Sequence, residues 1–342
     1  AHGAQSTWRT VLVQAFHSDV VKNGYFAVDV TDPDRPFFLW QLVGADPVVP
    51  LFAGPATPAI TTLFFDDGTT GGAREIAVAV LPGGYAASTG TEVARLAASN
   101  SFNKARPSIR RYNGASDSGR ALTIVRLDTG EIIKTFRRGA GKADVLLPVE
   151  FTGSGALKII DTPFDSPITG EPVAFPGDVG TVADRIFVGD EDGALWRIDL
   201  SSTNPANWKA SLFFDTYTKD LHGGTNGWKE GQPIATPAIL SVDLTGAVTV
   251  AVSTGSQESL EADAANNVVN YVWALRDVSG ADPSLWYRRF EEEERVTGPM
   301  TVFGQGLYFT TFKPSVAAGA CGGGDGYLWG MHYMTPVNAA DK

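Results

Sequence analysis

The sequence predicts an all-β fold, and three observations support that prediction. Short apolar and aromatic runs alternate with turn residues, including 38 Gly and 20 Pro among 342 residues. One segment, residues 184–202, has the complete pattern of a β-hairpin. The same pattern recurs along the chain, and no long run with helical periodicity competes with it. The chain is therefore expected to consist of many short strands.

The hairpin of residues 184–202 is the clearest of these elements. Its β-branched and aromatic residues predict a first strand over 186–188, and its alternating residues predict a second over 194–200. Between them, two Gly frame the acidic residues Asp190 and Asp192, which are expected to act as turn formers.

Four further segments repeat an aromatic strand, an acidic residue or Arg, and a short polar turn: 24–33, 121–131, 270–280 and 326–336. A second pattern, a Pro that opens an apolar run, occurs at 56–60, 165–168, 235–240 and 297–300. Proline suits the start of a strand because no ladder hydrogen bond is lost there. Repeated units of about four strands are typical of a β-propeller.

We therefore expect one β-propeller domain over residues 1–342, with six to eight blades and seven as the preferred number; residues 335–342 are its tail. A blade shared by the first strand near 8–16 and the last near 327–333 is one common way to close such a ring, and the sequence leaves the closure open. Residues 86–120 are polar and break the strand rhythm. They predict a long loop inserted between blades 2 and 3, of the kind that is either functional or mobile.

The charge of the chain bears on its partners. A net charge of −11 argues against a nucleic-acid-binding protein, which needs a basic surface. Residues 104–142 are the exception, with ten basic and three acidic residues. They form either a solvated surface or a docking patch for an acidic partner, for which Arg106, Arg110 and Arg111 are the candidate residues.

The sequence shows no catalytic constellation. It has no Gly-x-Ser-x-Gly, no Gly-Lys-Ser/Thr phosphate loop and no His-Glu-x-x-His, and Cys321 is its single cysteine. The acidic run 291–294 is expected to be a solvated connection. Most of the eight Trp are expected in the core, with Trp228 in a Gly-rich loop as the candidate contact residue. The sequence contains no run of about 18 apolar residues, which is the pattern that predicts a membrane-spanning helix.

Several segments together resemble one family, and they occur in that family's order: 7–13, 24–33, 184–201, 232–239, 252–258 and 306–323. The chain is similar to the C-terminal domain of PilY-type proteins of type IV pili. The resemblance implies a modified seven-bladed propeller from a larger exported protein at the bacterial cell surface. It also implies a place at the pilus tip with minor pilins, and a role in pilus assembly, retraction, attachment to host or abiotic surfaces, and twitching motility.

The family often carries a calcium loop immediately before the hairpin that here begins at Asp184. The resemblance places its oxygen-bearing positions at Pro176, Asp178, Gly180 and Asp184. Calcium prefers six to eight oxygen ligands, and only Asp178 and Asp184 supply carboxylates. We therefore expect weak calcium binding at best, and no other cofactor.

Two other functions stay open at this point. Residues 127–136 are similar to the turns of quinone-cofactor propellers, so a dehydrogenase that uses pyrroloquinoline quinone and calcium is the enzymatic alternative. A periplasmic propeller scaffold that meets envelope proteins is the other. The preferred interpretation is a non-enzymatic pilus assembly and adhesion module, because the ordered family segments come without a catalytic constellation.

Overall fold

The prediction of an all-β fold is confirmed. The computed structural model describes residues 8–17, 23–43, 52–68, 71–86, 93–94, 109–110, 118–138, 159–162, 164, 166–177, 180–217, 231–257, 268–278, 283–315 and 323–335. Within these ranges the elements are strands, apart from a single 3-10 turn at Pro205–Asn207. No helix in this part of the chain is long and apolar enough to cross a membrane.

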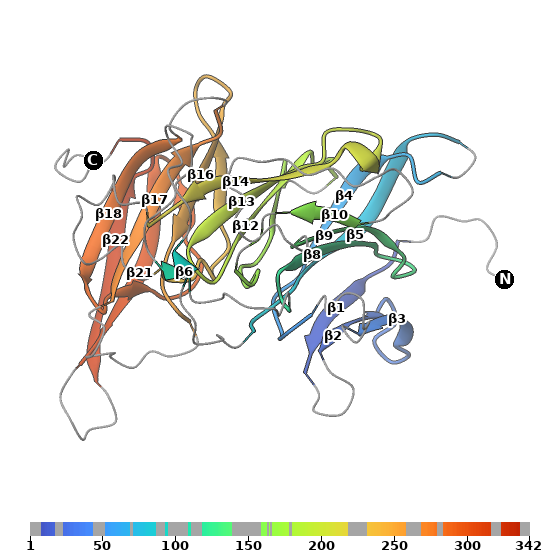
Figure 1. Cartoon of the computed structure of the whole chain (residues 1–342), viewed down its shortest axis with the longest axis horizontal. Helices are drawn as coiled ribbons and strands as arrows, with labels where there is room; N and C mark the ends of the chain where they lie inside the picture. Colours follow the sequence, from blue (N-terminus) through green and yellow to red (C-terminus); the bar gives the residue numbers. More distant parts are fainter. Residues whose placement is uncertain are drawn as a thin grey trace.

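The described strands form five larger sheets that follow one another in chain order (Figure 1). The first sheet contains β1 (Val11–Phe16), β2 (Gly24–Asp29) and β3 (Phe37–Val43). The second contains β4 (Ala59–Phe65), β5 (Arg74–Pro82), β8 (Ala121–Arg126), β9 (Ile132–Arg138) and β10 (Ile159–Thr162). The third contains β11 (Val173–Phe175), β12 (Arg185–Gly189), β13 (Ala194–Asp199) and β14 (Lys209–Asp215). The fourth contains β15 (Ile239–Val242), β16 (Val248–Ser253), β17 (Val269–Arg276) and β18 (Ser284–Glu292). The fifth contains β19 (Arg295–Val296), β20 (Thr301–Phe303), β21 (Gly306–Pro314) and β22 (Gly324–His332).

The third and fourth sheets show the blade pattern most completely. Each is an antiparallel meander of four strands in sequence order. The second sheet differs at its edge, where β10 runs parallel to β9. These sheets agree with the predicted propeller architecture. Seven blades remain a prediction, because the described residues form five larger sheets and one small hairpin of β6 (Val93–Ala94) and β7 (Ile109–Arg110).

One prediction about chain connections is corrected, and one possible closure of the ring is excluded. The insertion of residues 86–120 does not separate two blades, because β5 and β8 on either side of it pair with each other in the second sheet. The first and last strands do not share a blade. Among the described strands β1 pairs with β2 and β22 with β21, and β1 and β22 lie toward opposite ends of the molecule in Figure 1.

The predicted hairpin of residues 184–202 is confirmed as β12 and β13, and its turn shows why it forms. The carboxylate of buried Asp190 accepts hydrogen bonds from the backbone N–H of Asp192 and of Ala194, at 3.0 and 2.8 Å. Its other oxygen accepts the indole N–H of Trp196 at 3.0 Å. Gly193 takes a φ of +81°, which a side chain would oppose. Asp190 is therefore a turn former, as predicted.

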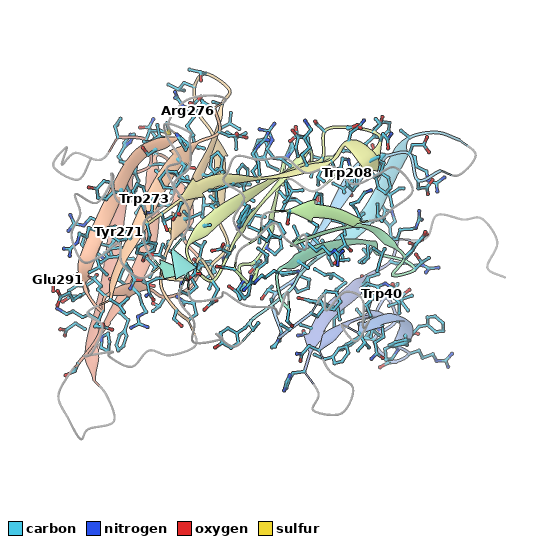
Figure 2. The ribbon with its side chains drawn as sticks, viewed as in Figure 1. Trp40, Trp208, Tyr271, Trp273, Arg276 and Glu291 are labelled. Carbon is cyan, nitrogen blue, oxygen red and sulfur yellow. The ribbon has the colours of Figure 1, made fainter. Side chains whose placement is uncertain are left out.

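The hydrophobic core is divided among the junctions between neighbouring sheets. Four clusters join the first sheet to the second, the second to the third, the third to the fourth, and the fourth to the fifth. Trp208 lies at the junction of the second and third sheets (Figure 2). Its ring packs edge-on against that of Phe65, with the ring centroids 5.4 Å apart. Truncating such a Trp typically costs about 3–5 kcal/mol of stability.

Most of the Trp that the structure describes follow the predicted core role. Five are at most 5% exposed: Trp40, Trp196, Trp208, Trp273 and Trp286. Trp329 is half-buried against the core, and Trp8 is the exception, with 96% of its surface exposed. Aromatic side chains in the repeated strands therefore pack between sheets, as the repeat pattern predicts.

The acidic run 291–294 is only partly the solvated connection expected from the sequence. Glu293 and Glu294 are 6% and 4% exposed. Glu293 pairs with Arg295 at 3.3 Å, and the hydroxyl of Thr311 donates to Glu294 at 2.5 Å. The side-chain amide of Asn270 donates to the Glu294 carbonyl at 2.9 Å. We call these five residues the buried glutamate cluster; it ties β17 to β21 and fills the corner that the chain turns after β18.

Candidate functional site: the loop before the Asp184 hairpin

The candidate site is the loop that joins β11 to β12. These strands are antiparallel neighbours, with Val173 opposite Phe187 and Phe175 opposite Arg185. The loop is closed at its base by a hydrogen bond from the Asp184 N–H to the Phe175 carbonyl at 2.9 Å. The Asp184 carbonyl in turn accepts the N–H of Leu200 at 2.8 Å. The backbone of Asp184 is therefore fixed from both sides.

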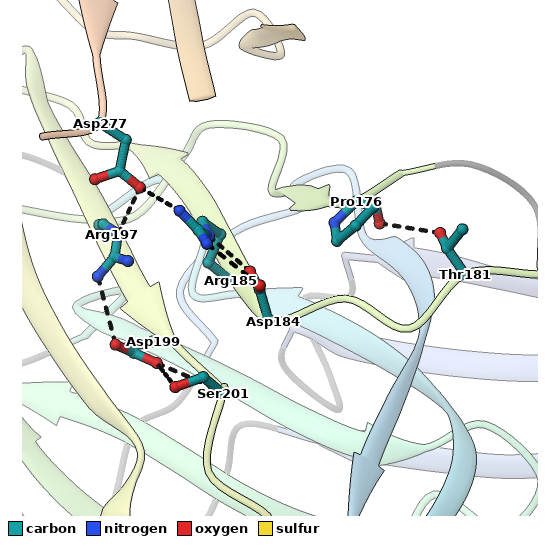
Figure 3. Close-up of polar contacts among 8 residues, drawn as sticks. All are labelled: Pro176, Thr181, Asp184, Arg185, Arg197, Asp199, Ser201 and Asp277. Atoms are coloured by element: carbon teal, nitrogen blue, oxygen red, sulfur yellow. Dashed lines mark hydrogen bonds and ion pairs between the residues drawn. The ribbon is translucent and has the colours of Figure 1, made fainter. Parts of the chain in front are cut away.

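The Asp184 carboxylate is bound by the neighbouring Arg185. Arg185 donates through Nε to one carboxylate oxygen at 2.6 Å and through a terminal nitrogen to the other at 3.2 Å (Figure 3). This two-point contact matches the planar guanidinium to the planar carboxylate. The hydrogen bond to Asp184 raises the pKa of Arg185, against the opposing effect of burial. Both Asp184 oxygens are therefore engaged by a permanent positive charge.

Arg185 also reaches the next sheet. Its remaining terminal nitrogen donates to Asp277, just after β17, at 2.7 Å. Arg197 on β13 donates to the same Asp277 oxygen at 3.0 Å and lies 3.6 Å from Asp199. We call Asp184, Arg185, Arg197, Asp199 and Asp277 the aspartate–arginine cluster. It joins the third sheet to the fourth across a partly exposed junction.

Asp199 is held ionised within this cluster. Partial burial raises the pKa of its carboxyl, but two hydrogen bonds from Ser201 and the charges of Arg197 and Arg185 outweigh that effect. Its pKa therefore lies below the ordinary value. The Ser201 contacts are the backbone N–H at 3.0 Å and the hydroxyl at 2.6 Å.

The described residues of the loop do not fit a calcium ion. Pro176 and Gly180 have no side-chain oxygen, and the Pro176 carbonyl faces the Thr181 hydroxyl at 3.5 Å. Arg185 donates a hydrogen bond to each Asp184 oxygen, and its positive charge repels a cation placed beside them. Among the described residues, no group of three or more His, Cys, Asp or Glu is placed to hold a metal. What this arrangement does chemically is pair charges and hold two sheets together.

Most of the other predicted site residues lie outside the described part of the chain: Arg106, Arg111, Asp178 and Trp228. Arg110 is described only as a residue of β7. The structure therefore places Asp184 and brings it together with Arg185 and Asp277, which the sequence did not single out. The Asp-Arg pair at 184–185 was a local signal for the first of these contacts. Asp277 lies 92 residues from Arg185 and gave no signal.

The turn that resembles those of quinone enzymes has a structural role. It connects β8 to β9, and the N–H of Arg126 donates to the Glu131 carbonyl at 2.9 Å. The indole of Trp40 donates to the Leu127 carbonyl at 2.9 Å. Gly130 lies so close to Trp40 that a Cβ there would meet the indole ring at 2.6 Å. Contact with the first sheet therefore accounts for the Gly in this turn.

Comparison with known proteins identifies the fold. No protein-family model and no curated protein matches the sequence. Among solved structures, the chain is similar to the crystal structure of the Pseudomonas aeruginosa PilY1 C-terminal domain, with a TM-score of 0.57 and 17% sequence identity. The match covers 96% of this chain and 67% of that chain. At the level of the fold, the resemblance predicted from the sequence is confirmed.

Proposed function

We propose that this chain is a non-enzymatic, PilY-like module of a type IV pilus, exposed at the cell surface after export through the periplasm and outer membrane. It acts at the pilus tip with minor pilins and supports pilus assembly, retraction, surface attachment and twitching motility. The observation that carries the proposal is the fold likeness to the PilY1 C-terminal domain over 96% of the chain. The family-like segments, which run in the same order from residues 7–13 to 306–323, support it independently.

The best test is recovery of partners with the whole 342-residue chain as bait. From an envelope extract of a piliated bacterium, minor pilins should be enriched. A matched bait with Arg106→Ala, Arg110→Ala and Arg111→Ala should retain less of them, because these residues belong to the basic segment proposed to dock an acidic partner. Recovery of outer-membrane assembly proteins in place of pilins would favour the periplasmic scaffold.

A genetic measurement complements the pull-down. A strain that lacks the gene should show reduced piliation, attachment and twitching, and the gene in trans should restore them. Normal piliation and motility in the deletion strain would overturn the proposal. Alcohol-dependent dye reduction after addition of pyrroloquinoline quinone and calcium would instead establish the dehydrogenase.

A further inference from the structure

Strand β22 is an edge strand whose outer side lacks a neighbour among the described strands. It pairs with β21 over nine residues, from Gly306 opposite His332 to Pro314 opposite Gly324. Its segment shares the aromatic strand-and-turn pattern of β13 and β17, which are third strands of four. In those sheets β14 and β18 cover the third strand. By this comparison the fifth sheet has a place for one more strand, beside β22.

The backbone of β22 is ready to receive that strand. The bonds from Ser315 N–H to the Gly323 carbonyl and from Tyr333 N–H to the Gln305 carbonyl, both 2.8 Å, fix which residues face β21. Odd-numbered residues 325–331 direct their N–H and C=O groups to β21, so the even-numbered ones direct theirs outward. The outward residues are Gly324, Gly326, Leu328, Gly330 and His332. Their backbone groups have no partner in the part of the chain that the structure describes.

The usual protection of an edge strand is weak on β22. Natural edges are guarded by charges, Pro or bulges. The edge strand β18 has four charged residues among its nine, whereas β22 has only Asp325. Leu328 is 78% exposed and Tyr327 is 45% exposed. The edge is therefore long, nearly uncharged and apolar at its centre.

We propose that the occupant is a second copy of this chain, and that two β22 strands pair antiparallel around a two-fold axis. Full overlap of the five outward residues puts Leu328 on the axis, opposite its own symmetry mate. In the same register Tyr327 lies opposite Trp329 of the partner subunit, and Asp325 lies opposite Met331 of the partner subunit. No like charges face each other, and each apolar or aromatic pair stabilises such a ladder by about 0.2–1 kcal/mol. This self-complementarity is what selects a second copy over an unrelated strand.

Sedimentation velocity over a concentration series tests the dimer. The unmodified chain should move from monomer to dimer as its concentration rises. Leu328→Lys and Leu328→Glu should each stay monomeric, because they place like charges opposite each other at the axis. An equimolar mixture of the two variants should recover the dimer, since Lys then faces Glu. Leu244→Lys, at a fully exposed turn residue outside β22, should dimerise like the unmodified chain.

Two results would overturn the proposal. One is an unmodified chain that is monomeric at every concentration reached. The other is a dimer that survives Leu328→Lys, which would place the contact elsewhere. Because Leu328 is largely exposed, these variants are expected to share the melting temperature of the unmodified chain at concentrations where that chain is monomeric, and this measurement separates loss of pairing from loss of fold.

Discussion

Two ionic clusters join neighbouring sheets of this molecule, and water reaches them to different extents. In the aspartate–arginine cluster the side chains of Arg185 and Arg197 are 23% and 24% exposed. In the buried glutamate cluster those of Arg295 and Glu293 are 6% and 7% exposed. Partly exposed pairs are screened by water and salt, whereas a buried charge that loses its partner is left without compensation. The two junctions should therefore respond differently to the same kind of substitution.

The largest effect is expected at Glu293. Glu293→Gln removes the negative charge that lies 3.3 Å from the buried Arg295 guanidinium, so the free energy of unfolding should fall by about 3–5 kcal/mol. Urea denaturation measures this change. Glu292→Gln, at the exposed neighbouring residue, is the matched control and should change little. Equal effects of the two variants would contradict the importance of burial.

A smaller effect is expected at Asp277. Asp277→Asn removes the charge shared by Arg185 and Arg197 at a partly exposed site, so the loss should be about 1–2 kcal/mol. Salt should shrink this loss more than the loss at Glu293, because mobile ions screen partly exposed pairs. Asp34→Asn, at an exposed carboxylate outside the cluster, serves as the control. If the loss of unfolding free energy in Asp277→Asn does not depend on salt, the two junctions do not differ in how strongly salt screens them.

Asp243 extends the comparison to pH. Arg276 pairs with Asp243 inside the fourth sheet, while the next residue, Asp277, pairs with the third. The Thr245 hydroxyl bond lowers the pKa of Asp243 to about 2, with further help from the N–H groups of Thr245 and Ala247 and from Arg276, against an opposing effect of desolvation.

Because the folded pKa is depressed, the stabilisation by Asp243 is fully present above the unfolded pKa near 4 and is lost as the pH falls toward 2. Asp243→Asn should therefore destabilise the protein at pH 6, and the difference from the unmodified chain should shrink between pH 4 and 2. Urea midpoints measured across this range check the prediction. A constant difference would assign the effect to lost hydrogen bonds alone.

The smallest effect is expected at the surface pair of Glu291 and Lys313. These side chains lie 2.5 Å apart at the surface, and Glu291 is 72% exposed. Exposed pairs contribute little to stability because water competes for both charges. Glu291→Gln should leave the melting temperature unchanged in a thermal scan. A clear decrease in the melting temperature would show that solvent exposure does not determine how much these ion pairs contribute to stability.

The sequence predicted the features that depend on local contacts and missed those that depend on residues far apart in the chain. The Asp184 hairpin was predictable because its signals are local, including turn residues and the contact from Trp196 to Asp190 six residues away. The pairing of β5 with β8 was not, because strand alternation does not say which strand becomes the neighbour across an insertion. The four consecutive acids of residues 291–294 predict solvent exposure. The burial of Glu294 depends on Thr311 and Asn270, which are distant in the chain and donate hydrogen bonds to it in the folded structure.

The candidate site divides in the same way. The family resemblance implied its position before the hairpin, and the residues at that position showed its shortage of oxygen ligands. The adjacent Asp-Arg pair was a local signal for the contact between Asp184 and Arg185, whereas the two-point geometry of that contact required the folded structure. The link to Asp277 required the packing of two sheets.

Arg185 neutralises Asp184 at the base of this loop, and weak calcium binding at best stays the prediction for the site. The most direct test is thermal unfolding of the unmodified chain in calcium and in chelator. We expect the same melting temperature in both. A ligand at 100 times its dissociation constant stabilises the folded state by about 2.7 kcal/mol, so specific binding would be visible. A melting temperature that rises with calcium, and no longer does so in Asp184→Asn, would contradict the claim.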